Sequence, residues 1–345
     1  LDVDPVFDGN AAVSFSVAGD WTSNAAVDLS GKATIVTFNG TGAQTIGGTD
    51  TTTFRGVTIN TASGTATLAH SETVKSGDLT VTAGTLDLSS YTMNRSASGG
   101  TLTVSNGATL KIGGTNSFPT NYATHTLGAT STVEYNGSAQ TVTAESYGHL
   151  TLSGSGTKTM PGSAMTIAGN FRMSGTASAT AAQALTVNLN FSLGSGTTFG
   201  AASYSHGVKG NFSNSGTFTA STSTFTFDGT SAQTIGGSNA TTFNALTLSN
   251  SAGVSLSAVD ATVGGTLTLT SGKITTGAGN KVVIPASGSV SRTSGHVVGN
   301  FQKNVATGAT SRTFEVGDAS SYTPVSVVFA SVTTAGDLTA STAAG

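Results

Sequence analysis

The sequence predicts an all-β protein: a parallel β-solenoid of short coils rich in Thr, Gly and Ser, followed by a small β-sandwich-like C-terminal segment. Three observations favour this fold: a unit that recurs about every 95 residues, strict alternation of apolar and polar residues, and Gly-rich turns between the alternating segments. Charged residues make up only 8% of the 345 residues and apolar residues 37%. This composition differs from the high charge and low hydrophobicity of disordered chains.

The repeat is most visible in three related segments. They are FNGTGAQTIGG at residues 38–48, YNGSAQTV at 135–142 and FDGTSAQTIGG at 227–237. Each contributes an aromatic residue, a Gly and a Gln as structural markers: Phe38, Gly40 and Gln44; Tyr135, Gly137 and Gln140; Phe227, Gly229 and Gln233. A phosphate-binding loop would need a Lys and a following helix, and the sequence provides neither here. The markers are therefore interpreted as turns of a repeated scaffold.

Within the units, apolar and polar residues alternate with the period of a β-strand. In TLTLTSGKI (266–274), Leu267 and Leu269 are expected to face the interior and the Thr residues the solvent. No long segment has the apolar stripe of a helix, so almost no helix is predicted. Coils of about 20 residues would give about 14 stacked coils.

We place the solenoid at residues 1–294 and the C-terminal segment at residues 295–345. A β-sandwich remains as an alternative architecture, because Asn39-Gly40 and Asp228-Gly229 are typical of hairpin turns.

Composition and residue spacing also bear on function. The net charge is −3 with no basic stripe, which argues against nucleic acid as a partner. The chain has no Cys and no apolar run of 18 residues, so neither a disulfide nor a membrane-spanning helix is expected. The 16 carboxylates form no obvious cluster, and the five His residues match no metal-ligand spacing. We therefore expect no enzymatic activity.

The sequence suggests one metal site, at its beginning. Asp2, Asp4 and Asp8 could offer carboxylate oxygens to Ca²⁺, and calcium is the only cofactor that the sequence suggests. The alternative is structural, because Phe7-Asp8-Gly9 also looks like the end of a preceding repeat. Exposed aromatic residues could bind a glycan, but Trp21 and Tyr147 recur in phase with the repeat and are expected in the core.

Two segments resemble known proteins. Residues 232–274 resemble the β-strand repeats of bacterial secreted and cell-surface proteins, such as autotransporter passengers and filamentous adhesins. The C-terminal pattern FxVGD…YxPV is similar to a segment that opens a small β-sandwich in secreted repeat proteins. It is formed here by Phe314, Val316, Gly317, Asp318, Tyr322 and Pro324. The resemblance implies an extracellular or cell-surface location.

These observations favour a non-catalytic structural protein, a β-rich rod of a bacterial surface layer, sheath or self-assembling fibre. Its partners would be copies of itself, joined head to tail or by strand donation. The candidate assembly strand contains Tyr322, Val325, Val327 and Phe329. One alternative is an adhesin that binds a glycan or a host or neighbouring surface. A second alternative is a carbohydrate-active β-helix enzyme.

Overall fold

The computed structural model describes residues 14–31 and 34–342, and these residues contain β-strands but no helix. They form a parallel β-solenoid of about 14 turns with small antiparallel sheets near the C-terminus, which confirms the predicted fold class. The chain divides into two compact units. The first comprises residues 1–161, 167–169 and 174–178, and the second comprises residues 162–166, 170–173 and 179–345.

The first unit contains a succession of mostly short strands. These are β1 (Phe15–Val17), β2 (Trp21–Ser23), β3 (Val27–Asp28), β4 (Ile35–Phe38), β5 (Gln44–Gly48), β6 (Thr52–Phe54), β7 (Gly56–Leu68), β8 (Glu72–Val74), β9 (Leu79–Asp87), β10 (Met93–Arg95), β11 (Gly99–Val104), β12 (Thr109–Ile112), β13 (Tyr122–Leu127), β14 (Thr132–Tyr135), β15 (Gln140–Thr141), β16 (His149–Leu152) and β17 (Thr157–Thr159). Strands β18 (Met165–Ile167) and β20 (Ser178–Thr180) contain residues of both units.

Strand register in the first unit follows the alternation seen in the sequence. Val36 pairs with Val57, Val57 with Leu79, and Leu79 with Leu102, all in parallel, so one coil takes 21 to 23 residues. These four side chains are buried. The intervening residues form an outward column in which Thr37, Thr58, Thr80 and Thr103 pair in turn. The period-two pattern thus places apolar side chains inside and β-branched polar side chains outside.

The second unit continues the same construction with longer strands toward its end. Its strands are β19 (Phe171–Met173), β21 (Leu185–Val187), β22 (Phe191–Leu193), β23 (Thr198–Gly200), β24 (Ser205–Val208), β25 (Phe212–Asn214), β26 (Thr217–Thr219), β27 (Thr224–Phe227), β28 (Gln233–Gly236), β29 (Thr241–Phe243), β30 (Ala245–Ser249), β31 (Val254–Leu256), β32 (Ala261–Val263), β33 (Thr266–Ser271), β34 (Lys273–Thr275), β35 (Lys281–Ile284), β36 (Ser289–Arg292), β37 (His296–Val298), β38 (Asn300–Val305), β39 (Gly308–Phe314), β40 (Val325–Val332) and β41 (Gly336–Ala340).

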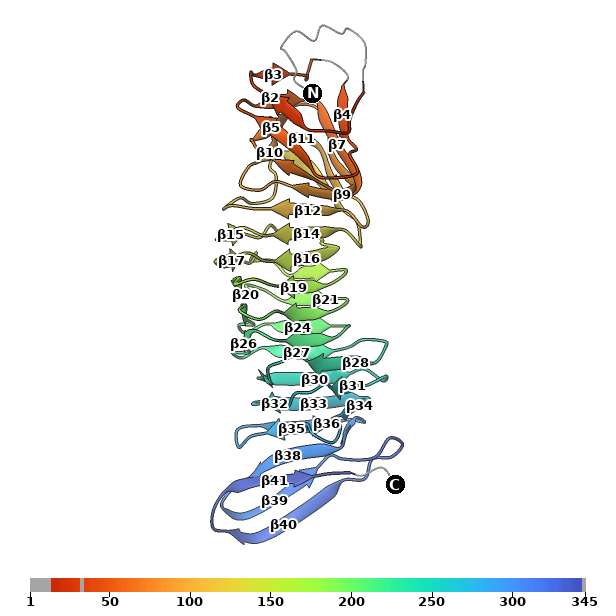
Figure 1. Ribbon diagram of the computed structural model, residues 1–345. Helices are drawn as coiled ribbons and strands as arrows, with labels where there is room; N and C mark the ends of the chain where they lie inside the picture. The colour runs from red at the N-terminus through yellow and green to blue at the C-terminus, as the bar shows by residue number, and fades with distance from the viewer. Residues whose placement is uncertain (1–13, 32–33, 343–345) are drawn as a thin grey trace. The chain divides into compact units, whose positions relative to one another are not determined.

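Phenylalanine side chains fill much of the core of the second unit. Phe191 and Phe212 occupy paired positions on β22 and β25, and their rings stack with centroids 5.2 Å apart and an interplanar angle of 14°. Leu267 and Leu269 are fully buried, as the alternation predicts. In Figure 1, strands β24, β27, β30, β33 and β36 lie in successive coils of one sheet.

The strand arrangement changes near the C-terminus. β38 pairs in parallel with β35 and in antiparallel fashion with β41, and β39 pairs in antiparallel fashion with β40. The parallel coils therefore extend past residue 294 to β38. Antiparallel pairing follows, in the segment where the sequence predicts a sandwich-like arrangement.

Candidate functional site

The three repeat markers lie at corners where the chain passes from one strand to the next within a coil. Phe38 ends β4 and Gln44 begins β5, and these strands pair in parallel with neighbouring coils instead of with each other. The same holds for β27 and β28 around residues 227–233. The Asn-Gly and Asp-Gly dipeptides thus turn a corner of the solenoid and do not form the hairpins of a β-sandwich.

The marker Gln is buried and holds two successive corners together. The Gly40 N–H donates to Gln44 Oε1 at 2.8 Å, and Gln44 Nε2 donates to the carbonyl oxygens of Val17 (2.9 Å) and Gly19 (2.6 Å). Val17 is the residue that pairs with Phe38 one coil earlier. The side chain therefore satisfies backbone groups of both corners.

The other two copies repeat this arrangement. Gln140 accepts from the Gly137 N–H and donates to the carbonyls of Ile112 and Asn116. Gln233 accepts from the Gly229 N–H and donates to the carbonyls of Val208 and Gly210.

The marker Gly is required by close packing of successive corners. A Cβ atom added at Gly40, Gly137 or Gly229 would collide with the carbonyl oxygen of Ala18, Gly114 or Lys209, respectively. Each of these oxygens belongs to the corner one coil earlier. The motif that resembled a ligand loop thus has a structural explanation at all three sites.

The middle copy replaces two Phe residues by Tyr and has a shorter connection between them. Tyr147 Oη donates to the Thr143 carbonyl at 2.7 Å, and the Thr143 N–H donates to Tyr135 Oη at 3.0 Å. The two hydroxyl oxygens are 3.1 Å apart. The two Tyr hydroxyls therefore satisfy the backbone N–H and carbonyl groups of Thr143 in the shortened connection. Tyr147 and Trp21 are both buried, as the sequence predicts.

Glu72 and Lys158 are ionisable side chains that occupy inward positions in the first unit. Burial raises the pKa of Glu72 from 4.5 to about 7; Oε2 accepts the Thr52 N–H at 2.5 Å, while Oε1 is buried without a partner among the described residues. Burial lowers the pKa of Lys158 from 10.5 to about 8. Lys158 Nζ donates to Gly137 O, Ser138 O and Gln140 Oε1 at 2.7–2.8 Å. Lys158 therefore stabilises the corner that Gln140 also holds.

The structure gives little support for a metal centre in the part of the chain that it describes. Asp2, Asp4 and Asp8, the candidate calcium ligands, lie outside the described residues. Within residues 14–31 and 34–342, no group of three or more His, Cys, Asp or Glu side chains is arranged to hold an ion. His125 Nδ1 and Glu145 Oε1 are 2.5 Å apart, but His125 Nε2 is buried without a hydrogen-bond partner in this same part of the chain.

The FxVGD…YxPV pattern folds against the last parallel coils. Phe314 is buried with its ring edge-on to Phe301 at 6.3 Å. Asp318 Oδ1 accepts the backbone N–H groups of Ser320 and Ser321, both at 2.6 Å, and hydrogen bonds from Ser320 lower the pKa of the Asp318 carboxyl. Tyr322 precedes β40 and lies 3.4 Å below the guanidinium of Arg292.

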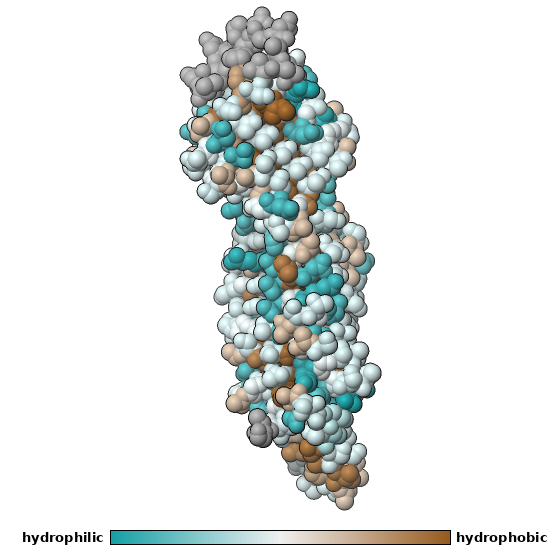
Figure 2. Space-filling model, turned by 90° about the vertical axis from the view of Figure 1, so that its right-hand side faces the viewer, coloured by the Kyte–Doolittle hydropathy of each residue, from teal (hydrophilic) through white to brown (hydrophobic). Residues whose placement is uncertain are grey.

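The other candidate assembly residues, Val325, Val327 and Phe329, lie in β40 itself. In the described part of the chain β40 pairs only with β39, so one of its edges has no partner there. Val325 is 43% exposed and Val328 is 82% exposed. Figure 2 shows hydrophobic side chains gathered at the surface of that end of the second unit where β39 and β40 pair. The sequence prediction names Val325, Val327 and Phe329, which occupy alternate positions of the strand. It does not name Val328, which lies between two of them.

The described residues contain no helix that is long and apolar enough to cross a membrane. Comparisons with models of protein families, with curated proteins and with solved structures find no match to this chain.

Proposed function

We propose that this chain is a non-catalytic, extracellular structural protein of a bacterial surface layer, sheath or fibre, and that its copies associate through β40. The resemblance of residues 232–274 and of the FxVGD…YxPV segment to secreted bacterial proteins supports the location. The stacked coils support the structural role, because ladder hydrogen bonds and a continuous apolar core stabilise them with few charges.

The observation that carries the proposal is the edge of β40 with which no strand of the described residues pairs. Edge strands of soluble proteins usually have charges, Pro residues or bulges that prevent pairing with another chain. The sequence VSVVFASV of β40 contains no charge and no Pro over eight residues. Its high content of β-branched and aromatic residues favours addition of another strand.

A second copy of β40 is the occupant that fits this edge best. The edge is uncharged, so it fits an uncharged strand, and β40 meets that requirement itself. Antiparallel pairing about a two-fold axis at Val328 would place Val327 of one copy opposite Phe329 of the other. This contact uses the same surface on both copies and closes as a dimer. A filament then needs a second contact between different surfaces.

The mass of the protein in solution tests this proposal. Light scattering after size-exclusion chromatography is expected to give a dimer at high micromolar concentration, and Val328→Lys is expected to give a monomer because a charge at the centre of the paired edge prevents pairing. Leu189→Lys is the matched control: Leu189 is another exposed apolar residue of the second unit, 47% exposed and outside β40. This control should remain dimeric. A monomeric native protein, or a Val328→Lys variant that stays dimeric, would overturn the proposal.

A second candidate function is that of an adhesin that binds a glycan. It is favoured by one observation, a cavity in the second unit in which a positive charge has no carboxylate partner among the residues that the structure describes. The ligand class that this cavity fits is argued next.

A further inference from the structure

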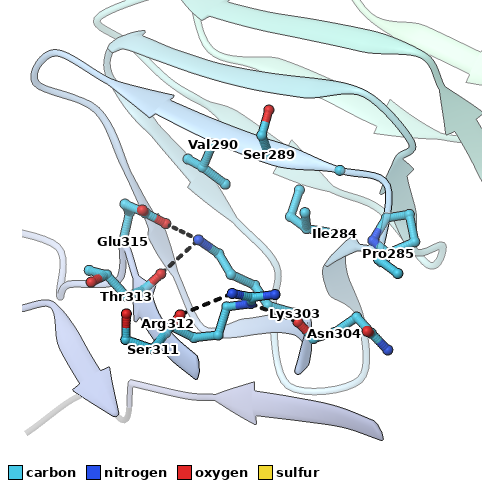
Figure 3. Close-up of a pocket in the computed structure, with 12 residues that line it drawn as sticks. Ile284, Pro285, Ser289, Val290, Lys303, Asn304, Ser311, Arg312, Thr313 and Glu315 are labelled. Carbon is cyan, nitrogen blue, oxygen red and sulfur yellow. Dashed lines mark hydrogen bonds and ion pairs between the residues drawn. The ribbon is translucent and has the colours of Figure 1, made fainter. Parts of the chain in front are cut away.

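A cavity of about 310 Å³ lies in the second unit where the last parallel coils meet β39 (Figure 3). One wall is formed by residues 284–290, which connect and include parts of β35 and β36. The opposite wall is formed by β38 and β39, which contribute Lys303, Arg312 and, just after β39, Glu315. Three charged side chains, from β38, from β39 and from the residue that follows β39, therefore converge on one small space.

Lys303 and Glu315 neutralise each other. Lys303 is only 7% exposed, and its Nζ donates to Glu315 Oε2 at 2.6 Å and to the Thr313 carbonyl at 2.7 Å. Figure 3 shows these two bonds side by side at one end of the cavity. The negative charge of Glu315 is thus engaged by the buried ammonium.

The guanidinium of Arg312, by contrast, donates to neutral groups. Its Nε donates to the Asn304 carbonyl at 2.9 Å, and Nη1 donates to Thr310 Oγ1 and to the Ser311 carbonyl, all of which are neutral acceptors. Among the described residues, no carboxylate forms an ion pair with Arg312, and Nη2 makes no hydrogen bond. Burial, and to a smaller extent the charge of Arg312, lower the pKa of Lys303 although Glu315 opposes this change. With Lys303 and Arg312 positive and Glu315 negative, the charged side chains that line the cavity sum to a net charge of about +1.

The remaining lining includes an apolar wall. Ile284, Pro285 and Val290 provide this wall, whereas the hydroxyl of Ser289 lies 3.1 Å from Thr266 Oγ1 and points away from the cavity (Figure 3). Ligand pockets commonly combine apolar walls with a few polar groups that fix orientation, and a volume near 300 Å³ is at the small end of their range. The space suits a single sugar ring better than a larger molecule.

We propose that this cavity binds the carboxylate of an acidic sugar residue, with Arg312 as the group that recognises the carboxylate. Nη2 of Arg312 makes no hydrogen bond with the described residues, so its N–H groups can donate to a carboxylate, and such a charge-assisted bond is stronger than one between neutral groups. The apolar wall fits the C–H face of a pyranose ring. A doubly charged phosphate is disfavoured because Glu315 stands beside the site, so the net charge matches a single negative charge. This inference develops the second candidate function, glycan binding, and is independent of association through β40.

Calorimetric titration of the full chain with galacturonate and glucuronate tests the inference. Both are expected to bind, more weakly at high salt because the recognition is electrostatic. Galactose and glucose, which lack the carboxylate, should bind at least about tenfold more weakly, as expected for loss of a hydrogen-bonded charge. Arg312→Gln should weaken uronate binding by a similar factor. Arg172→Gln is the matched control, since Arg172 is an exposed arginine on β19 outside this cavity, and it should bind as the native chain does.

A further variant separates ligand recognition from a purely structural role. Glu315→Gln removes the one negative charge of the cavity and should tighten uronate binding severalfold, provided that circular dichroism shows an unchanged fold. Uronate binding that Arg312→Gln leaves unchanged would overturn the inference, as would no uronate binding by the native chain. Tighter binding of inorganic phosphate than of uronate would overturn the sugar assignment. Binding of neutral sugars equal to that of uronates would overturn the role of Arg312 while leaving an adhesin function in place.

Discussion

Replacement of Glu72 by Gln is expected to remove a large part of the pH dependence of the stability of the first unit. The pKa of Glu72 rises from 4.5 to about 7 in the folded chain because the carboxyl is buried. A difference of this size corresponds to about 3 kcal/mol of unfolding free energy. Because the pKa is higher in the folded chain than in the unfolded chain, the unfolding free energy is highest below pH 4.5, where the carboxyl is protonated in both states. It falls by this amount as the pH rises through 7. The native protein should therefore unfold more easily at pH 8 than at pH 5.

Trp21 provides a direct probe of this effect. It is the only Trp in the chain. Its Nε1 donates to Thr52 Oγ1 at 2.9 Å, and the Thr52 N–H donates to Glu72. Urea denaturation followed by Trp fluorescence at pH 5 and pH 8 should give a difference between the two unfolding free energies that is about 2.5 kcal/mol smaller in Glu72→Gln than in the native chain. The amide keeps an oxygen for the Thr52 N–H but does not titrate.

Glu134→Gln is a matched control on the same unit. This carboxylate is partly exposed and lies 3.6 Å from Lys111. Its replacement should leave most of the difference between pH 5 and pH 8 in place. The reasoning fails if Glu72→Gln shows the same pH dependence as the native chain, because an inward carboxylate that titrates normally has not been desolvated.

Two further predictions concern the corners of the solenoid. Gln233→Leu should lower the unfolding free energy by about 3 kcal/mol, because the buried Gly229 N–H and the Val208 and Gly210 carbonyls lose their partner. Urea denaturation followed by circular dichroism measures this loss. Gln183 is partly exposed, and the control variant Gln183→Leu should change the unfolding free energy little. The native chain should also become more stable by up to about 2 kcal/mol between pH 8 and pH 9.5, because the pKa of Lys158 is lowered to about 8 and the unfolded chain binds the extra proton in this range. Lys158→Met should lack this increase in Trp fluorescence measurements, and an unchanged increase would mean that another group titrates.

The fold could be predicted from the sequence because its determinants are local and repeated. Alternation places Leu267 and Leu269 inside, and the same rule applied to each coil gives the parallel stack. The recurrence of residues 38–48, 135–142 and 227–237 marked corresponding corners. The role of the marker Gln was not predictable, because its acceptors are backbone carbonyls in the preceding coil that no side-chain pattern reveals.

The inward ionisable groups left a signal that the sequence analysis did not use. Glu72 stands two residues before the buried Val74, and Lys158 stands between two exposed Thr residues, so each occupies the inward phase of its strand. His206 does the same on β24, and its Nε2 lies 2.9 Å from the Ala201 carbonyl. A charged or titratable residue in the inward phase of an alternating segment thus indicates a buried polar contact whose partner has to be found in the structure.

The two proposed binding features both lie where the repeat ends, and this follows from the construction of the fold. Within the coil stack, each side chain has similar neighbours one coil before and one coil after, so a feature such as the Gln corner recurs along the chain. Antiparallel pairing at β38 and β39 brings unlike strands together, and within residues 14–31 and 34–342 Lys303 has a carboxylate partner whereas Arg312 has none. In the same part of the chain, one edge of β40 has no paired strand. A ligand contact or an assembly contact is made once per chain, so it fits this non-repeated region, and self-similarity of the sequence cannot reveal it.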